Sequence, residues 1–138
     1  MKKLLSLFIA ACLAFAAVTG CTTTKIQANV VGTVPAGTTT AEVKQAIIDA
    51  ANVRGWVLSE KSANSFLAHH SRGEYSATVQ IDYDKTRYVI TYVDSTGFKT
   101  KEGKIDKHYN DWVTHLNNDI QNAILQQKNL RFSSSKKI

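Results

Sequence analysis

Two short runs of strict alternation constrain the fold of this chain more than any other feature of its sequence. Apolar side chains stand at every second position of these runs, at Tyr75, Ala77, Val79, Ile81 and Tyr83 and then at Tyr88, Ile90 and Tyr92. A period of two is typical of β-strands with one buried face. Because residues 84–87 have the composition of a turn, the runs predict an antiparallel hairpin with the cross-strand pairs Tyr83–Tyr88, Ile81–Ile90 and Val79–Tyr92.

The second strand of this hairpin also carries apolar side chains on its outer face, at Val89 and Val93. The outer face of the first strand is polar there, with Thr78 and Gln80. An apolar stripe on a polar surface indicates a contact surface. We therefore predict that Val89 and Val93 form a candidate binding surface, covered by a partner or by the apolar segment 26–34. That segment is also a candidate edge strand.

A helix is predicted over residues 40–54. Thr39 and Glu42 have the spacing of a capping box, in which each side chain accepts a hydrogen bond from a backbone N–H of the first turn. Apolar residues then follow the helical period at Val43, Ala46, Ile47 and Ala50. Gly55 suits the left-handed residue that commonly ends a helix.

A longer helix is predicted from its N-cap Asp106 to about residue 127. Its apolar stripe is the strongest in the chain, with Tyr109, Trp112, Val113, Leu116, Ile120, Ala123 and Ile124. The opposite side, which carries Asp111 and Asn118, is expected to face solvent. Residues 129–138 are expected to form a basic, disordered tail, with contact to anionic headgroups as the alternative.

Two further strands are predicted at residues 56–60 and 65–70, and residues 94–105 are expected to form a polar loop. The order helix, four strands, helix indicates an α+β fold over residues 40–128, an antiparallel sheet of about four strands packed on one face by two helices. Six aromatic residues are expected in the core between these layers: Trp56, Tyr83, Tyr88, Tyr92, Tyr109 and Trp112. Alternatively, they line a ligand pocket.

The N-terminus predicts export from the cytoplasm. Lys2 and Lys3 precede an uncharged apolar stretch over residues 4–18. This stretch is short for a spanning helix, which needs about 20 apolar residues, and it fits the plan of a secretory signal peptide over residues 1–20. An uncleaved membrane anchor is the alternative.

The segment Val18-Thr19-Gly20-Cys21 resembles the lipobox of bacterial lipoproteins. The resemblance implies that Cys21 receives a diacylglycerol thioether, that the chain is cut before it, and that its new amine is acylated by palmitate or a similar chain. Three acyl chains anchor a protein stably. Thr22 follows instead of the aspartate that retains lipoproteins in the inner membrane, so the resemblance implies the outer membrane. We expect the periplasmic face, with the cell surface as the alternative. Residues 21–39 would then be the lipid anchor and a flexible tether.

Several motifs of the domain resemble a group of small outer-membrane lipoproteins of Gram-negative bacteria. They are Gly55-Trp56, Ile81-Asp82-Tyr83, Ile90-Thr91-Tyr92, Asp94-Ser95 and Ile105-Asp106-Lys107-His108-Tyr109-Asn110-Asp111-Trp112-Val113. Asp106 departs from the family pattern, where histidine is often found. The resemblance covers residues 40–125 and implies a fold and a cellular location, but no activity.

The histidines are candidate metal ligands. His69 and His70 are adjacent in a predicted strand, so their side chains point to opposite faces. His108, Asp111 and His115 share one face of the long helix, but a metal would need a further ligand from elsewhere. A solvated helix flank is the alternative, and we predict no metal site and no cofactor. The sequence contains no nucleophile elbow, zinc-protease motif or phosphate-binding loop, so neither catalytic residues nor an enzyme are predicted.

The net charge of the mature chain limits the classes of partner that it can bind. Without Lys2 and Lys3 it has 15 basic and 11 acidic residues, a net charge of +4. This permits contact with anionic lipid, lipopolysaccharide or peptidoglycan, and it does not suggest nucleic acid. We therefore predict a non-catalytic, lipid-anchored envelope protein that presents a small α+β module to a protein partner or an envelope polymer. The alternative is a carrier that holds a small apolar or peptide ligand between sheet and helices.

Overall fold

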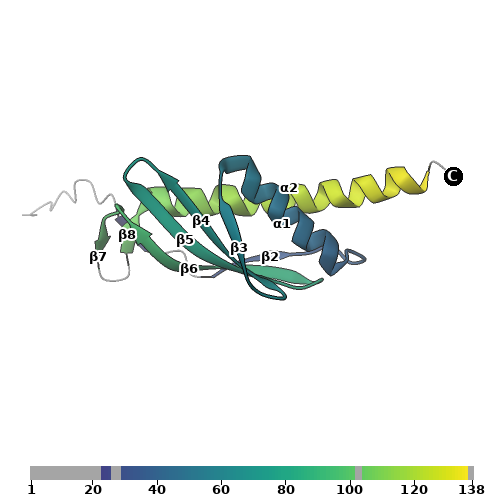
Figure 1. The fold of residues 1–138 in the computed structure, drawn as a ribbon, viewed down its shortest axis with the longest axis horizontal. Helices are drawn as coiled ribbons and strands as arrows, with labels where there is room; N and C mark the ends of the chain where they lie inside the picture. The colour runs from purple at the N-terminus through teal and green to yellow at the C-terminus, as the bar shows by residue number, and fades with distance from the viewer. Residues whose placement is uncertain (1–22, 26–28, 102–103, 137–138) are drawn as a thin grey trace, which may run out of the picture.

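The computed structural model of the protein describes residues 23–25, 29–101 and 104–136. In this part of the chain, two helices pack on one face of a five-stranded antiparallel sheet (Figure 1). The elements are β1 Thr23–Lys25, β2 Val30–Thr33, α1 Thr40–Arg54, β3 Val57–Ser62, β4 Ser65–Arg72, β5 Tyr75–Tyr83, β6 Arg87–Thr96, β7 Thr100–Lys101, β8 Lys104–Asp106 and α2 Lys107–Ser135. The α+β class and the helical layer are confirmed; the main sheet has five strands in the described residues instead of about four.

The main sheet has the strand order β2-β6-β5-β4-β3. The β5–β6 hairpin has the predicted register, with the pairs Tyr83–Tyr88, Ile81–Ile90 and Val79–Tyr92. Thr78 then faces Asp94, so Val93 is an extra residue that forms a bulge in β6. The turn of the hairpin is closed by the Asp84 carboxylate, which accepts hydrogen bonds from the backbone N–H groups of Thr86 (2.7 Å) and Arg87 (2.9 Å).

Helix α1 begins and ends as its sequence predicts. The Thr39 hydroxyl accepts a hydrogen bond from the Glu42 N–H (3.1 Å), and the Glu42 carboxylate accepts one from the Thr39 N–H (2.9 Å). Gly55 has a φ of 80°, the left-handed conformation that glycine adopts without a steric penalty. The buried face of the helix consists of Val43, Ala46, Ile47, Ala50 and Ala51.

Part of the segment expected as a flexible tether is an edge strand. β2 pairs with β6, and this confirms the alternative reading of the segment 26–34 for residues 30–33. Gly32 lies opposite Tyr88, and a side chain at Gly32 would collide with the Tyr88 ring. The sequence supports this strand only as an alternative, because four residues are too few to establish a period. The signal segment 1–20, Cys21 and residues 26–28 lie outside the described residues.

The segment expected as a polar loop over residues 94–105 is largely paired. β6 continues to Thr96, and β7 and β8 join β1 in a small antiparallel sheet of order β1-β8-β7. Phe98, which lies between β6 and β7, is buried. The carboxylate of Asp106, the predicted N-cap, accepts a hydrogen bond from the His108 N–H (3.0 Å) at the start of α2. This bond is the main cause that lowers the pKa of Asp106.

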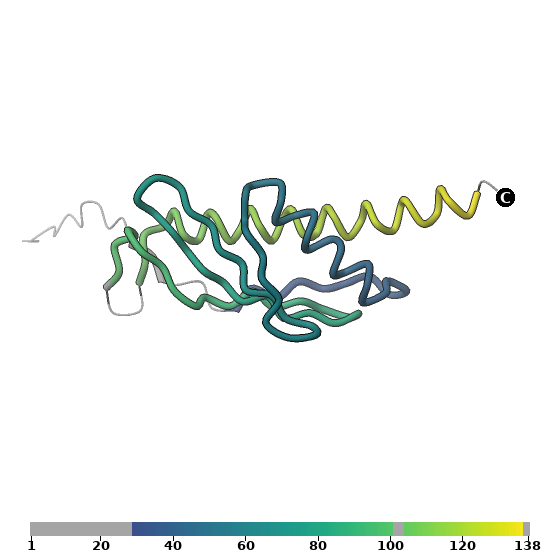
Figure 2. The backbone as a smooth tube through the Cα atoms, in the orientation of Figure 1, coloured from purple at the N-terminus to yellow at the C-terminus, as the bar shows by residue number. Residues whose placement is uncertain are grey.

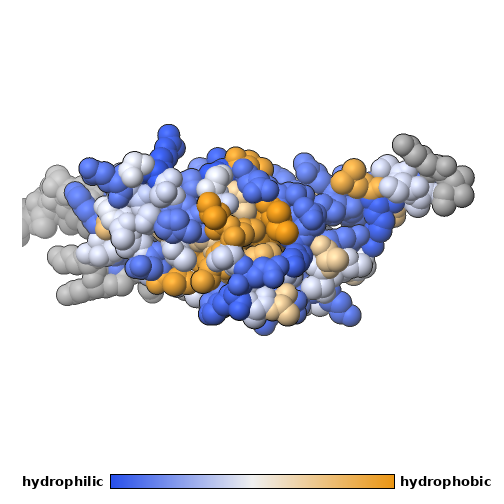
Figure 3. Space-filling view, in the orientation of Figure 1, coloured by the Kyte–Doolittle hydropathy of each residue, from blue (hydrophilic) through white to orange (hydrophobic). Residues whose placement is uncertain are grey.

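Helix α2 continues to Ser135, through most of the segment expected as a disordered tail. Figure 2 shows its C-terminal part projecting beyond the sheet. The Arg131 guanidinium donates to the Gly37 carbonyl (2.8 Å) and lies 3.5 Å from the Glu42 carboxylate, so it ties the helix to the start of α1. Leu125, Leu130 and Phe132 are exposed, and Figure 3 shows apolar surface on this projecting part. Among the described residues, no helix combines the length and apolar character needed to cross a membrane.

Side chains fill the interface between the sheet and the helices. Ile47 from α1, Ile81 and Ile90 from the hairpin, and Leu116 and Ile120 from α2 are all almost completely buried. Of the six aromatic residues expected in the core, the buried ones are Trp56, Tyr83, Tyr88 and Tyr109, and the partly buried ones at its margin are Tyr92 and Trp112.

Candidate functional site

A groove opens on the surface where the β4–β5 hairpin meets the end of α1 and the first half of α2. It consists of two adjoining depressions of about 390 and 540 Å³. The first is lined by Arg72, Gly73, Tyr75, Phe98, His108 and Trp112. The second shares Arg72, His108 and Trp112 with it and adds Arg54, Trp56, His70, Asp111 and His115. We call the two together the aromatic groove.

Trp112 lies at the centre of this groove and is held by three other rings. The centroid of its ring lies 4.6 Å from that of His70, 5.0 Å from that of Phe98 and 6.5 Å from that of Trp56, at interplanar angles of 73°, 82° and 86°. Phe98 is followed by Tyr75 at 5.1 Å. Edge-to-face pairs of this kind add about 0.5–1.5 kcal/mol each beyond burial. The groove therefore has a continuous aromatic wall whose central residue is only partly buried.

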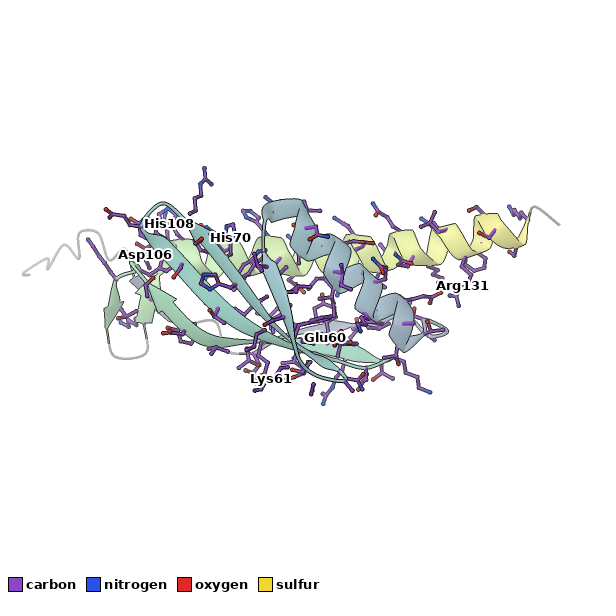
Figure 4. The ribbon with its side chains drawn as sticks, in the orientation of Figure 1. Glu60, Lys61, His70, Asp106, His108 and Arg131 are labelled. Atoms are coloured by element: carbon purple, nitrogen blue, oxygen red, sulfur yellow. The ribbon has the colours of Figure 1, made fainter. Side chains whose placement is uncertain are left out.

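The polar groups around the wall are mostly hydrogen-bond donors. The Arg54 Nε donates to the Asp119 carboxylate at 2.7 Å. His108 Nδ1 lies 2.7 Å from the Asp106 carboxylate. The side chains of Arg72 and His115 form no hydrogen bond or ion pair with the part of the chain that the structure describes. Figure 4 shows His70 and His108 on the same side of the molecule, as their shared depression requires.

This combination of rings and polar side chains can recognise a ligand. His108, Asp111 and His115 line the same depression, as their helical spacing implies. Within residues 23–25, 29–101 and 104–136, no group of three or more His, Cys, Asp or Glu side chains lies close enough to hold a metal ion. The guanidinium of Arg72, which has no partner among the described residues, lies beside an aromatic wall and suits an anionic ligand that has a flat or apolar part.

The predicted binding surface at Val89 and Val93 lies on the open face of the sheet, away from the helices. Val89 is half-buried and faces Val31 of β2, and Val93 is 46% exposed at the bulge. The edge strand therefore adds an exposed apolar residue, Val31, beside the stripe and does not cover it.

Several polar side chains of the open face bond to one another. Lys61 donates to Gln80 (2.6 Å), and Gln80 donates to the Asp82 carboxylate (2.9 Å). The Ser65 hydroxyl donates to the same carboxylate at 2.6 Å. His69 and Thr78 are bonded at 2.9 Å.

The sequence predicts Trp56 and Trp112 as core residues, with a ligand pocket as the alternative, and it does not single out Arg54, Arg72 or Phe98. These residues come from separate elements, so no local spacing connects them. The one local signal was the helical spacing of His108 and His115. Tyr92, also expected in the core, is partly buried at its margin. Its hydroxyl is hydrogen-bonded to that of Ser95 (2.9 Å), and its ring packs against the ring of Tyr109.

No family model matches this chain, and no curated protein sequence is significantly similar to it. The features of the chain that bear on its function are therefore the geometry of the aromatic groove and the motifs of the N-terminal segment.

Proposed function

We propose that the protein is a non-catalytic, lipid-anchored component of the cell envelope that binds an envelope polymer or a protein partner in its aromatic groove. The observation that carries this proposal is Trp112, a large aromatic side chain left partly exposed at the centre of a groove. Beside it is Arg72, whose side chain has no partner within the described part of the chain. Tryptophan and arginine are the residue types most enriched among those that dominate binding energy.

The lipobox segment Val18–Cys21 supports the anchor. β1 begins at Thr23, only two residues after Cys21, and it pairs with β8, which ends at Asp106. The Asp106 carboxylate bonds to His108 of the groove. With Cys21 acylated, the small sheet and the groove end of the domain would therefore lie close to the membrane surface, on the periplasmic side of the outer membrane.

The carrier remains the second candidate, but the packing favours it less. A carrier of the predicted kind needs room between sheet and helices, where Ile81, Ile90 and Leu116 are buried against other apolar side chains. The aromatic groove instead lies at the surface, at one end of this interface. A small ligand bound in the aromatic groove would use the same surface as the proposed envelope partner, so the protein would still be a recognition module.

The groove can be tested by envelope binding. The full-length lipidated chain in detergent micelles is mixed with isolated cell envelopes, and the bound fraction is measured after sedimentation. Arg72→Gln and Trp112→Leu are expected to lower the affinity about tenfold each, as the loss of a charge-assisted contact or an aromatic anchor does. Lys85→Gln, in the hairpin turn at the far end of β5, removes one exposed charge and should leave binding unchanged. Equal binding by all variants would contradict the proposal.

The anchor is tested separately. Cys21→Ser should abolish acylation and leave the uncleaved precursor, which mass spectrometry of the purified chain detects as a higher protein mass without acyl chains. Processing after residue 20 and membrane partitioning like those of the wild-type chain would show that Cys21 is not a lipidation site.

A further inference from the structure

We propose that the aromatic groove binds an acidic saccharide, a chain of pyranose rings that carries carboxylate or phosphate groups. This inference rests on the proposed function and names the ligand chemistry that the groove fits. It uses three features of the groove: the aromatic wall, the surplus of cationic donors, and the division into two adjoining depressions.

The aromatic wall suits sugar rings. The C–H bonds on the faces of a pyranose carry partial positive charge, and the face of an aromatic ring carries negative charge. Tyr75 is exposed and Trp112 is partly exposed on this wall, and the buried Phe98 connects them, with centroid separations of 5.1 and 5.0 Å. Each depression, at about 390 and 540 Å³, is within the size range of small-molecule sites. Successive rings of one chain can therefore occupy both.

The polar groups favour an anionic saccharide over a neutral one. Arg54 and Arg72 contribute two permanent positive charges against the single Asp111 carboxylate among the lining residues. Asp119 engages only the Nε of Arg54, and Arg72 has no partner among the described residues. A guanidinium binds carboxylates and phosphates through paired N–H donors. The Asp111 carboxylate, the ring nitrogens of His115 and the Nε2 of His108, whose Nδ1 is bonded to Asp106, can bond to sugar hydroxyl groups.

A saccharide also fits better than a membrane lipid. Acyl chains need a continuous apolar channel, and Arg72 and His108 stand where the two depressions join. Because both depressions have polar as well as aromatic walls, the ligand should present polar groups along its whole length. Hydroxylated rings do so, and acyl chains do not.

The test measures affinity by isothermal titration with the full-length chain in detergent micelles. The probes are the disaccharide of N-acetylglucosamine and N-acetylmuramic acid, which carries a carboxylate, and di-N-acetylchitobiose, its neutral counterpart with the same number of rings. Deacylated lipopolysaccharide core supplies the phosphate-bearing alternative, so the two acidic probes separate the two sources of this chemistry. At least one acidic probe should bind at least about tenfold more tightly than chitobiose.

The variants connect this binding to the groove. Arg72→Gln should lower the affinity for the acidic probe about tenfold and leave the affinity for chitobiose unchanged, because only the charged contact is lost. Trp112→Leu should lower the affinity for every saccharide, because ring stacking is lost. Lys85→Gln should leave all affinities unchanged. Thermal melting of each variant confirms that it is folded.

Three results would overturn the inference. Equal affinity for acidic and neutral disaccharides would show that the charge of the ligand has no role in binding. Binding of dihexanoyl phosphatidylglycerol that depends on Arg72 and Trp112, without saccharide binding, would identify a lipid site. If no saccharide binds while envelope binding still depends on the groove, the ligand class is wrong and the proposed function stands. Loss of groove dependence in both assays would contradict the proposed function itself.

Discussion

The open face of the sheet and the aromatic groove differ in how their polar groups are satisfied. On the open face, Lys61 bonds to Gln80 and His69 to Thr78, so the donors there already have acceptors within the sheet. In the groove, Arg72 stands beside an aromatic wall without a partner in the described part of the chain. A surface whose hydrogen bonds are internally satisfied offers a ligand little, because binding would break as many bonds as it forms. Exposed apolar residues alone therefore do not identify the binding surface.

The largest predicted effect is a difference in stability loss between two neighbouring residues, one from each region. Trp56 is 3% exposed and lies under the groove, whereas Val57 is 68% exposed on the open face. Trp56→Ala should cost about 3–5 kcal/mol of unfolding free energy, as large aromatic truncations in a packed core do. Val57→Ala should cost less than about 0.5 kcal/mol. Urea denaturation measures both, and similar losses would show that the two faces are not distinguished by burial.

A smaller, pH-dependent effect should come from Tyr88, whose side chain lies in the core that separates the two regions. Its hydroxyl donates to Asn117 and accepts a hydrogen bond from Gln121 (2.8 Å), and burial raises its pKa to about 12. An unfolded tyrosine titrates near pH 10. The fold therefore keeps its full stability below about pH 10 and loses roughly 2–3 kcal/mol as the pH rises towards 12.

The control for this titration is Tyr88→Phe, measured by denaturation at several pH values. It should cost about 1 kcal/mol at neutral pH through the lost hydrogen bonds, and it should show a smaller alkaline loss than the wild-type chain. A residual loss is expected, because burial also raises the pKa of Tyr109. An identical alkaline loss in the variant would show that Tyr88 is not responsible.

The smallest effect is expected on the open face. Val89→Lys together with Val93→Lys should lower the unfolding free energy by about 1 kcal/mol or less, because Val93 is at a bulge and the lysine ammonium groups can reach water. Envelope binding should be unchanged. Thermal melting and sedimentation measure the two outcomes together. A large drop in melting temperature would place the stripe in a buried interface, and weaker binding with an unchanged melt would make it the binding surface.

Local signals predicted helix α1 and the β5–β6 hairpin, but not the elements that depend on contacts between distant segments. The capping box of Thr39 and Glu42 fixed the start of α1, and strict alternation fixed the register of Ile81 opposite Ile90. The extension of α2 depends on Arg131 reaching the loop at Gly37, 94 residues away in the chain.

The aromatic groove escaped prediction for the same reason. Phe98 reaches Trp112 only because β6 continues past the expected loop start and returns through β7 and β8. Edge strand β2 depends on Gly32 accommodating the Tyr88 ring, a fit between two side-by-side strands that sequence periodicity does not reveal.

The most direct test of the groove as the binding surface uses two positions of equal exposure. Tyr75 at the groove is 45% exposed, and Val93 on the open face is 46% exposed. Each is replaced in turn by the photo-crosslinking residue benzoylphenylalanine, and the amount of envelope material captured in intact cells is compared. Capture from position 75 well above that from position 93, and abolished by Arg72→Gln, is the expected result. Capture mainly from position 93 would contradict the assignment and return the binding surface to the open face of the sheet.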